Sequence, residues 1–293
     1  MKMELYFENP SGTIHFKGSS HSLRNNAVIV KAVSGLGLPK QECKLASYVN
    51  RPGQELVSSR DLARVITLSV DVSCLHGCRA YLQRIIEGLY QPGVLTVLSG
   101  SLHRRIPCRC TEVSEPEKHG SNIVSLILQF TCDSPYFTDV HTQEAVLFKR
   151  TNLISESFQL PCVFTARVNR MLICNSGSVA SEPVVTISYM KGETDISVHS
   201  EEIGIMLTNH STGQKIRLLY DGNPGERVTL DIPGRSVLKN GAQDITSTLS
   251  SDSFLSDFCL QPGENDVEIV NFGIDKDVVV TMHYDNQYVE AVV

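Results

Sequence analysis

Residues 64–93 read RVITLSVDVSCLHGCRAYLQRIIEGLYQPG, and this stretch contains the two patterns that decide the fold. From Ile66 to Val72 every second residue is apolar, which is the spacing of a strand with one buried face. The next residues predict a helix at about 75–89, because its apolar side chains recur at helical spacing at Cys78, Tyr81, Leu82, Ile85, Ile86 and Leu89. A strand followed by one amphipathic helix indicates a sheet with a helix on its flank.

The rest of the first half predicts short strands and one long hairpin. Short alternating runs occur at Leu5–Phe7, Thr13–Phe16 and Ala27–Val33, and a polar stretch follows from Lys40 to Asp61. Ile106–Val113 and Asn122–Cys132 are separated by an eight-residue polar loop, which predicts a hairpin. Pro135 ends the second run, and Tyr136 and Phe137 offer a packing anchor where the chain leaves the sheet.

The second half predicts strands without a helix. The predicted strands are Val184–Tyr189, Ile196–Val198, Gly204–Leu207, Ile216–Tyr220, Arg227–Ile232, Asp266–Val270 and Val278–Tyr284, with Gly, Pro and Asn turns between them. Strands at this density predict an antiparallel sandwich or jelly roll. We therefore predict two mostly β domains, 1–150 with one helix and 151–293, joined by a connection at about 138–160.

Charge is uneven between these halves. Residues 1–150 carry 17 Lys and Arg against 13 Asp and Glu, so the totals of 26 and 32 leave 9 against 19 for the remainder. The halves therefore differ in net charge, +4 and −10, which favours two domains with different neighbours. Neither half has a dense basic stripe, so no nucleic-acid binding is expected. No apolar run predicts a membrane span or a secretory signal, so we expect the protein to be made and kept in the cytosol, or to leave it by lysis.

The motifs of common enzymes are missing, and we predict no catalytic, metal or cofactor site. There is no nucleophile elbow, Walker loop, zincin helix or dinucleotide fingerprint. Four of the nine cysteines form two close pairs, Cys74 with Cys78 and Cys108 with Cys110, near His76 and His103. Neither spacing is that of a zinc knuckle, so buried thiols are favoured over zinc.

Weaker patterns leave a binding function open as the alternative. Asp221-Gly222-Asn223 is read as a hairpin turn rather than a calcium loop, and the acidic pairs Glu201-Glu202 and Asp275-x-Asp277 as solvated surface. A β-sandwich could also bind sugar on an aromatic ring. The chain has no Trp, which leaves four tyrosines as candidate platforms: Tyr189, Tyr220, Tyr284 and Tyr288.

Four ordered stretches resemble the distal tail protein family of long-tailed phages, which also occurs in phage-tail-like bacteriocins. The first two are the strand, helix and Pro92-Gly93 stretch, and the hairpin ending in FTCDSPYF at 130–137. The third is LICNSGS at 172–178 followed by EPVVTI at 182–187. The fourth runs through Thr212-Gly213, GERVTLD at 225–231, Asn240-Gly241 and LQPGEN at 260–265. Their order along the chain is more specific than any one of them.

The resemblance implies a structural role in a tail tip rather than catalysis. It implies a homohexameric ring built by a tube-protein-like N-terminal β-sandwich, with the tail tube protein on one side and a tail-associated hub or spike protein on the other. It also implies a galectin-like C-terminal sandwich that supports receptor-binding proteins. The polar stretch from Lys40 to Asp61 is the predicted arm for contact between ring subunits. The alternative is a sandwich module at the tail tip that binds a carbohydrate or a receptor.

Overall fold

The computed structural model describes residues 3–18, 26–73, 78–119, 122–152, 165–193, 203–272, 274 and 276–291. The chain forms two compact units, which we call the N-terminal and C-terminal units. The N-terminal unit comprises Met1–Val140 together with Tyr288–Val293, and the C-terminal unit comprises His141–Gln287. Strands dominate both units, as the sequence predicts.

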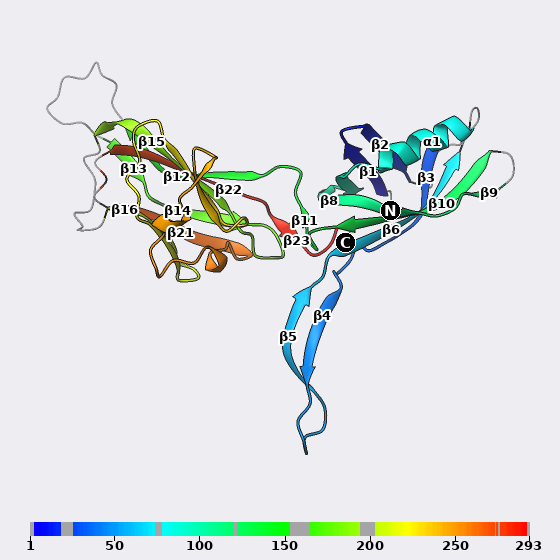
Figure 1. Cartoon of the computed structure of the whole chain (residues 1–293), viewed down its shortest axis with the longest axis horizontal. Coiled ribbons are helices and arrows are strands. Elements are labelled where there is room, and N and C mark those ends of the chain that lie inside the picture. Colours follow the sequence, from blue (N-terminus) through cyan, green and yellow to red (C-terminus); the bar gives the residue numbers. More distant parts are fainter. Residues whose placement is uncertain are drawn as a thin grey trace. The chain divides into compact units, whose positions relative to one another are not determined.

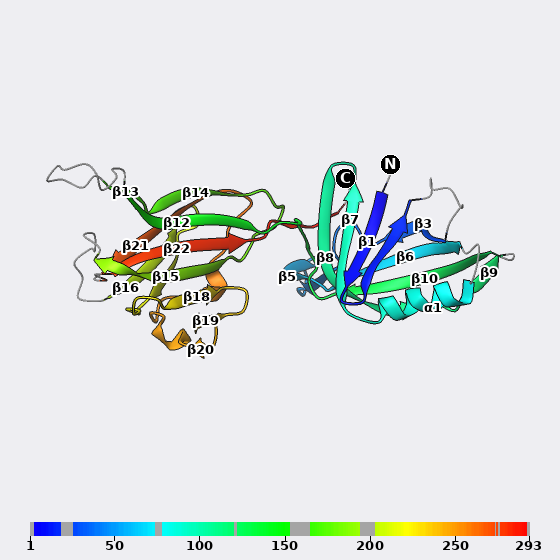
Figure 2. The ribbon, with the colours of Figure 1, turned by 90° about the horizontal axis from the view of Figure 1, so that it is seen from above.

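The N-terminal unit is built on one sheet that closes on itself. Its strands, in sheet order, are β23 (Gln287–Tyr288), β11 (Phe137–Thr138), β8 (Leu102–Val113), β7 (Gly93–Ser99), β1 (Met3–Asn9), β2 (Gly12–Lys17), β3 (Ala27–Ser34), β6 (Arg64–Ser73), β10 (Ile123–Cys132) and β9 (Glu117–His119). A further pairing of β8 with β10 joins the run from β8 to β10 into a ring. Figure 2 shows β8, β7, β1, β3, β6 and β10 following one another around it. The predicted sandwich is therefore a barrel-like closed sheet.

Alternating side chains of these strands fill the interior of the closed sheet. Ile66, Leu68, Val70 and Val72 of β6 are all fully buried, which confirms the period-two pattern. The predicted hairpin is also confirmed, because β8 and β10 pair antiparallel, with Phe130 opposite Cys110. The ring centroids of Phe7 and Phe130 lie 5.2 Å apart at the centre of this core.

Helix α1 (Cys78–Leu89) lies on the flank of the closed sheet (Figure 1). Ile85 and Leu89 are buried, and Tyr81 and Leu82 pack against the core in part. Ile86, which the predicted stripe includes, is 39% exposed. A helix resting on a curved sheet buries a narrower stripe than one lying on a flat face. The predicted helical residues 75–77 lie outside the described part of the chain.

Between β3 and β6 the chain forms a separate two-stranded hairpin. We call residues 38–61 the arm, which comprises β4 (Gln41–Ala46), β5 (Glu55–Asp61) and the tip between them. Its register runs from Gln41 opposite Asp61 to Ala46 opposite Glu55, with a bulge after Lys44. Figure 1 shows the arm projecting away from the rest of the N-terminal unit.

The C-terminal unit consists of two antiparallel sheets around one core. The seven-stranded sheet contains β13 (Thr165–Val168), β12 (Gln143–Asn152), β22 (Lys276–Tyr284), β15 (Val184–Glu193), β18 (Arg227–Asp231), β19 (Ser236–Lys239) and β20 (Gln243–Asp244). The four-stranded sheet contains β14 (Arg170–Asn175), β21 (Gly263–Phe272), β16 (Gly204–Asn209) and β17 (Gln214–Leu218). Two short 3-10 helices, Thr246–Thr248 and Leu255–Asp257, accompany them. Most strands predicted in this half are present, and Ile196–Val198 lies outside the described residues.

The boundary between the units lies earlier than the predicted one at 150/151. Residues 143–152, which the sequence analysis placed in a connection, form β12 and pair with β22, so the C-terminal unit begins at His141. The last six residues return to the N-terminal unit. That return depends on a partner 225 residues earlier in the chain, the Arg64 side chain, which a local pattern does not reveal.

Candidate assembly surfaces

The arm exposes large apolar side chains of the kind that are buried inside the closed sheet. Val49 at the tip is 91% exposed, and Tyr48 beside it is 51% exposed. Leu45 and Leu56 face each other across the two strands and are 54% and 57% exposed, while Val57 at the bulge is 65% exposed. Single exposed apolar residues are ordinary, but a group of them on one projecting element indicates a contact surface.

The backbone of the arm is also open to a partner. Within the part of the chain that the structure describes, β4 and β5 pair only with each other. A two-stranded ribbon leaves the outer N–H and C=O groups of both strands without a strand neighbour, and such edges readily accept another strand. The ion pair between Arg60 and Glu42, at 2.6 Å, spans the two strands near the base. The arm therefore offers backbone edges along its length and apolar side chains towards its tip.

The base of the arm is fixed to the closed sheet by Arg64. Its guanidinium donates hydrogen bonds to four backbone carbonyls: those of Gly35 and Gly37 at 2.6 Å, Pro135 at 2.8 Å and Val289 at 2.6 Å. It also lies 4.6 Å from the ring centroid of Phe137. The residue is only 2% exposed, and burial lowers the pKa of the guanidinium. Arg64 thus joins the segments that flank the arm to the C-terminal segment.

Two further contacts hold the base in place. The Tyr136 hydroxyl donates to the Asp61 carboxylate at 2.6 Å, and the backbone N–H of Leu62 donates to Lys40 O at 2.8 Å. Burial, followed by the hydrogen bond to Asp61, raises the pKa of Tyr136 to about 12, so the hydroxyl stays protonated at neutral pH. Gly35 has a φ of +88°, and a Cβ there would lie 2.2 Å from Val65 O. The arm is therefore anchored at one end and uncovered along its length.

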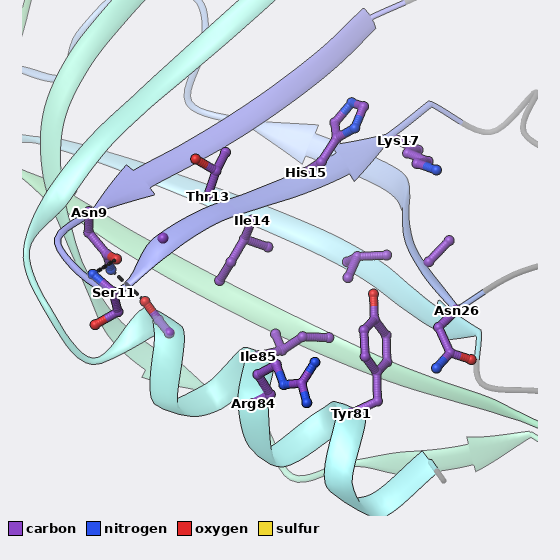
Figure 3. A pocket seen from close by; sticks show the side chains of 14 residues that line it. Asn9, Ser11, Thr13, Ile14, His15, Lys17, Asn26, Tyr81, Arg84 and Ile85 are labelled. Carbon is purple, nitrogen blue, oxygen red and sulfur yellow. Dashed lines mark hydrogen bonds between the residues drawn. The ribbon is translucent and has the colours of Figure 1, made fainter. Parts of the chain in front are cut away.

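A second surface feature is a groove of about 460 Å³ between β2, β3 and α1. β2 pairs with β3 only at Phe16 and Lys17, so the beginning of β2 has an open edge on that side. Figure 3 shows Ile14 directed towards the helix and Tyr81 directed back towards the strands. Arg84 and Lys17 add positive charge to the lining. The groove combines a strand edge with an apolar floor.

Two of the four candidate tyrosines are buried in the structure, and the other two, Tyr220 and Tyr288, are partly covered by neighbouring side chains. Tyr189 is 1% exposed, and its hydroxyl donates to Tyr220 O at 3.1 Å. The Tyr220 ring packs edge-on against it, and the Tyr220 hydroxyl donates to Glu226 at 2.7 Å. Tyr284 is 9% exposed, and the Arg104 guanidinium covers the Tyr288 ring at 3.4 Å. Stacking a sugar requires an open ring face, and these rings are used in packing.

The turn at Asp221-Gly222-Asn223 is shaped by packing and local hydrogen bonds. Gly222 is packed against the Tyr189 ring, where a Cβ would lie 2.4 Å from the ring. The Glu226 carboxylate accepts from the backbone N–H of Asn223 at 2.9 Å and pairs with Lys239 at 2.7 Å. These contacts, the hydrogen bond from Lys239 first, lower the pKa of Glu226 to about 2. The carboxylate that could contribute to a cation site is thus already bound by protein groups.

The candidate metal ligands form no cluster among the described residues. Cys74 and His76 lie outside the described residues. The acidic residues Glu201, Glu202 and Asp275, which were predicted to be solvated surface, lie outside them as well. His103 is exposed on β8, whereas Cys108 on the same strand is buried. No group of three or more His, Cys, Asp or Glu side chains suited to a metal occurs among the residues with a described position. In the same part of the chain, no helix is long and apolar enough to cross a bilayer.

Sequence reasoning missed two features of the assembly surfaces. It described 40–61 as polar, whereas the arm also exposes Leu45, Val49, Leu56 and Val57. It did not single out Arg64, although a charged residue at the start of an apolar strand is a signal for a buried hydrogen-bond network. The carbonyls that Arg64 binds come from three distant segments, so only the structure identifies them.

The anchored arm with its exposed apolar side chains is typical of proteins that assemble with partners. The family model described as "Siphovirus-type tail component, C-terminal domain" matches residues 176–288. Residues 176–288 are thus similar to the C-terminal domain of siphovirus-type tail components. This match confirms the resemblance drawn from the ordered motifs of the second half.

Solved structures show the same fold over nearly the whole chain. The crystal structure of the Dit protein of phage SPP1, described as a paradigm of the hub adsorption apparatus in phages that infect Gram-positive hosts, matches with a TM-score of 0.65. Identity is 12%, and the match covers 98% of this chain and 99% of that chain. Two structures of the phage P2 baseplate in its activated conformation, with Ca and with Sr, match at TM-scores of 0.46 and 0.45. Both are 10% identical, and they cover 97% and 96% of this chain and 98% of each of those chains. No curated protein sequence matches the chain.

Proposed function

We propose that six copies of this chain form a closed ring at the distal end of the tail. In this proposal the N-terminal unit builds the ring, the tail tube protein contacts one face, and a tail-associated hub or spike protein contacts the other. The C-terminal unit, a galectin-like sandwich, supports receptor-binding proteins. Assembly takes place in the bacterial cytoplasm, before the particle is released.

The arm is the observation that carries the proposal. A ring requires a heterologous contact, in which one surface of a subunit meets a different surface of the next. The arm supplies one such surface, because it projects from the sheet, exposes apolar side chains and has open backbone edges. Its anchoring by Arg64 and Tyr136 fixes the direction in which it leaves the sheet. A fixed direction favours a closed ring over an irregular aggregate.

Charge supports the same arrangement. The first 150 residues are close to neutral, which suits a surface packed between other tail proteins. The strongly acidic remainder suits a unit that stays solvated, and the absence of a basic stripe suits a lumen through which DNA passes without binding.

Co-expression with the tube and hub proteins of the same phage tests this function. We expect the three proteins to copurify, and negative-stain images to show sixfold rings with the tube protein on one face. A chain that stays monomeric, copurifies with neither protein and is retained on host cell walls would instead establish the carbohydrate- or receptor-binding module.

A further inference from the structure

Two buried cysteines lie at the end of the strand pairing that closes the N-terminal sheet. The register of β8 and β10 places Phe130 opposite Cys110 and ends with Thr131 opposite Arg109. Continued by one residue on each strand, the same register would place Cys132 opposite Cys108. Directly opposed residues of an antiparallel pair have Cα atoms about 4.5 or 5.5 Å apart. A disulfide spans Cα distances of about 4.4–6.8 Å, so the backbone need not move to allow one.

Both side chains belong to the same buried core, and the residues are 5% and 0% exposed. The interaction between the two thiol groups raises the pKa of Cys108 and lowers that of Cys132, and the charge of Arg64 lowers the pKa of Cys132 further. Among the six cysteines whose side chains the structure describes, these are the two whose thiol groups shift the pKa of one another.

A small oxidant has a route to this pair. Cys108 lines an open pocket of about 310 Å³, together with Pro92, Gly93, Arg109 and Thr131. Hydrogen peroxide is little larger than water, so this pocket admits it to the surface of Cys108, one sulfur atom away from Cys132. Larger oxidants would have to wait for a local opening of the strand ends.

We propose that Cys108 and Cys132 are a modification site, at which a disulfide forms after the virion leaves the reducing cytosol of its host. Cytosolic thiols are kept reduced, whereas virion surfaces meet an oxidising medium. The bond would join β8 to β10, the pairing that closes the sheet. The tail tip would thus be assembled with two thiols and locked after release. This inference rests on the tail-tip location and not on ring formation.

Peroxide supplies the two oxidising equivalents. Cys108, which lines the pocket, passes its proton to the Cys132 thiolate, and its sulfur attacks one oxygen of hydrogen peroxide. This step forms an S–O bond and breaks the O–O bond, and the leaving hydroxide takes a proton from solvent to become water. The Cys132 sulfur then attacks the sulfenic sulfur, forming the S–S bond and breaking the S–O bond. The displaced hydroxide takes the Cys132 proton and leaves as a second water. Two thiols are oxidised, and one peroxide is reduced to two waters.

Oxidation of the full chain with dilute hydrogen peroxide tests the proposal. After the reaction, the remaining thiols are alkylated in denaturant, and the peptides are mapped by mass spectrometry. We expect one peptide pair linked through Cys108 and Cys132, with the loss of two hydrogen atoms, and a rise in melting temperature that a reductant reverses. Cys108→Ala and Cys132→Val should each abolish both effects, whereas Cys110→Ala, on the same strand, should retain both.

The same mapping on released particles, with the alkylating agent added at lysis or hours later, tests whether the bond forms after release. We expect free thiols at lysis and the linked pair afterwards. Full alkylation of Cys108 and Cys132 under conditions that oxidise the exposed Cys43 would overturn the proposal. So would linkage of either residue to a different cysteine. This test uses the natural chain alone, so the poor folding of a variant could not obscure its result.

Discussion

The arm and the strand that follows it differ in burial although both contain large apolar residues. In β6, from Ile66 to Val72, every second side chain is fully buried, whereas Leu56 and Val57 in the preceding β5 are more than half exposed. Both segments are strands of one unit, separated by two residues. The difference teaches that apolar content alone does not place a strand in a core. A strand is buried when neighbouring strands cover it, and in the proposed ring those neighbours of the arm come from another chain.

Matched leucine truncations should produce the largest contrast between the closed sheet and the arm. Leu128 of β10 is fully buried, so Leu128→Ala should lower the free energy of unfolding by about 2–5 kcal/mol through lost burial and a cavity. Leu45→Ala on the arm should change it by less than about 0.5 kcal/mol in the monomer, because the side chain is already in water. Urea denaturation of both variants measures the difference. Equal losses would mean that the arm is packed in the monomer.

Replacing Arg64 should sharpen the comparison at the boundary between the two regions. Arg64→Leu leaves four backbone carbonyls without their donor, and we expect a loss of about 3 kcal/mol. Limited proteolysis should also show faster cleavage at the base of the arm and near the C-terminus, since both segments lose their anchor. Arg64→Lys keeps the charge but has fewer hydrogen-bond donors. Its free energy of unfolding should therefore lie between the values for the natural chain and for Arg64→Leu. An unchanged melting curve for Arg64→Leu would show that the network does not hold the base.

Acidification should lower the free energy of unfolding of the C-terminal unit through Glu226, by less than the Arg64→Leu substitution does. Its folded pKa of about 2 lies below its ordinary value of 4.5. The ionised form therefore contributes stability that is present above about pH 4.5 and is lost as the pH falls towards 2. Because the ion pair is near the surface, we expect the loss to be at most about 1 kcal/mol. Glu226→Gln should flatten this part of the stability profile, and an unaltered slope between pH 5 and pH 2.5 would contradict the assignment.

The individual strands and the helix of the N-terminal sheet were easier to predict from the sequence than the arm was, because local patterns specify them. Alternation in β6 and β10 and the stripe of α1 are local patterns, and the structure confirms them apart from the exposed Ile86. The sheet closes where β8 pairs with β10, and each of these strands also has a second neighbour, β7 and β6 respectively. The spacing of residues along the sequence does not show which strands become neighbours. The family resemblance, in contrast, could be drawn from the turn residues of the C-terminal unit. The sandwich fixes the order in which these turns follow one another along the chain.

The assembly surfaces were only partly predictable. The position of the arm between Lys40 and Asp61 followed from a break in the strand pattern, but its exposed leucines and valines resembled ordinary core residues. The contacts of Arg64 could not be predicted, since they join carbonyls at Gly35, Pro135 and Val289. The facing thiols of Cys108 and Cys132 likewise require the register of two strands. Long-range pairing is the information that single-sequence patterns lack.

The most direct test of the ring is the solution mass of the full chain by light scattering over a concentration series. The comparison includes an arm variant, Leu45→Ser with Val49→Ser and Leu56→Ser, and a control, Leu172→Ser, which removes a 65% exposed apolar side chain from the C-terminal unit. We expect the natural chain and the control to reach the mass of about six 32.3 kDa subunits, and the arm variant to remain a folded monomer. An arm variant that still forms the ring, or a natural chain that stays monomeric even with the tube and hub proteins present, would contradict the proposed role of the arm.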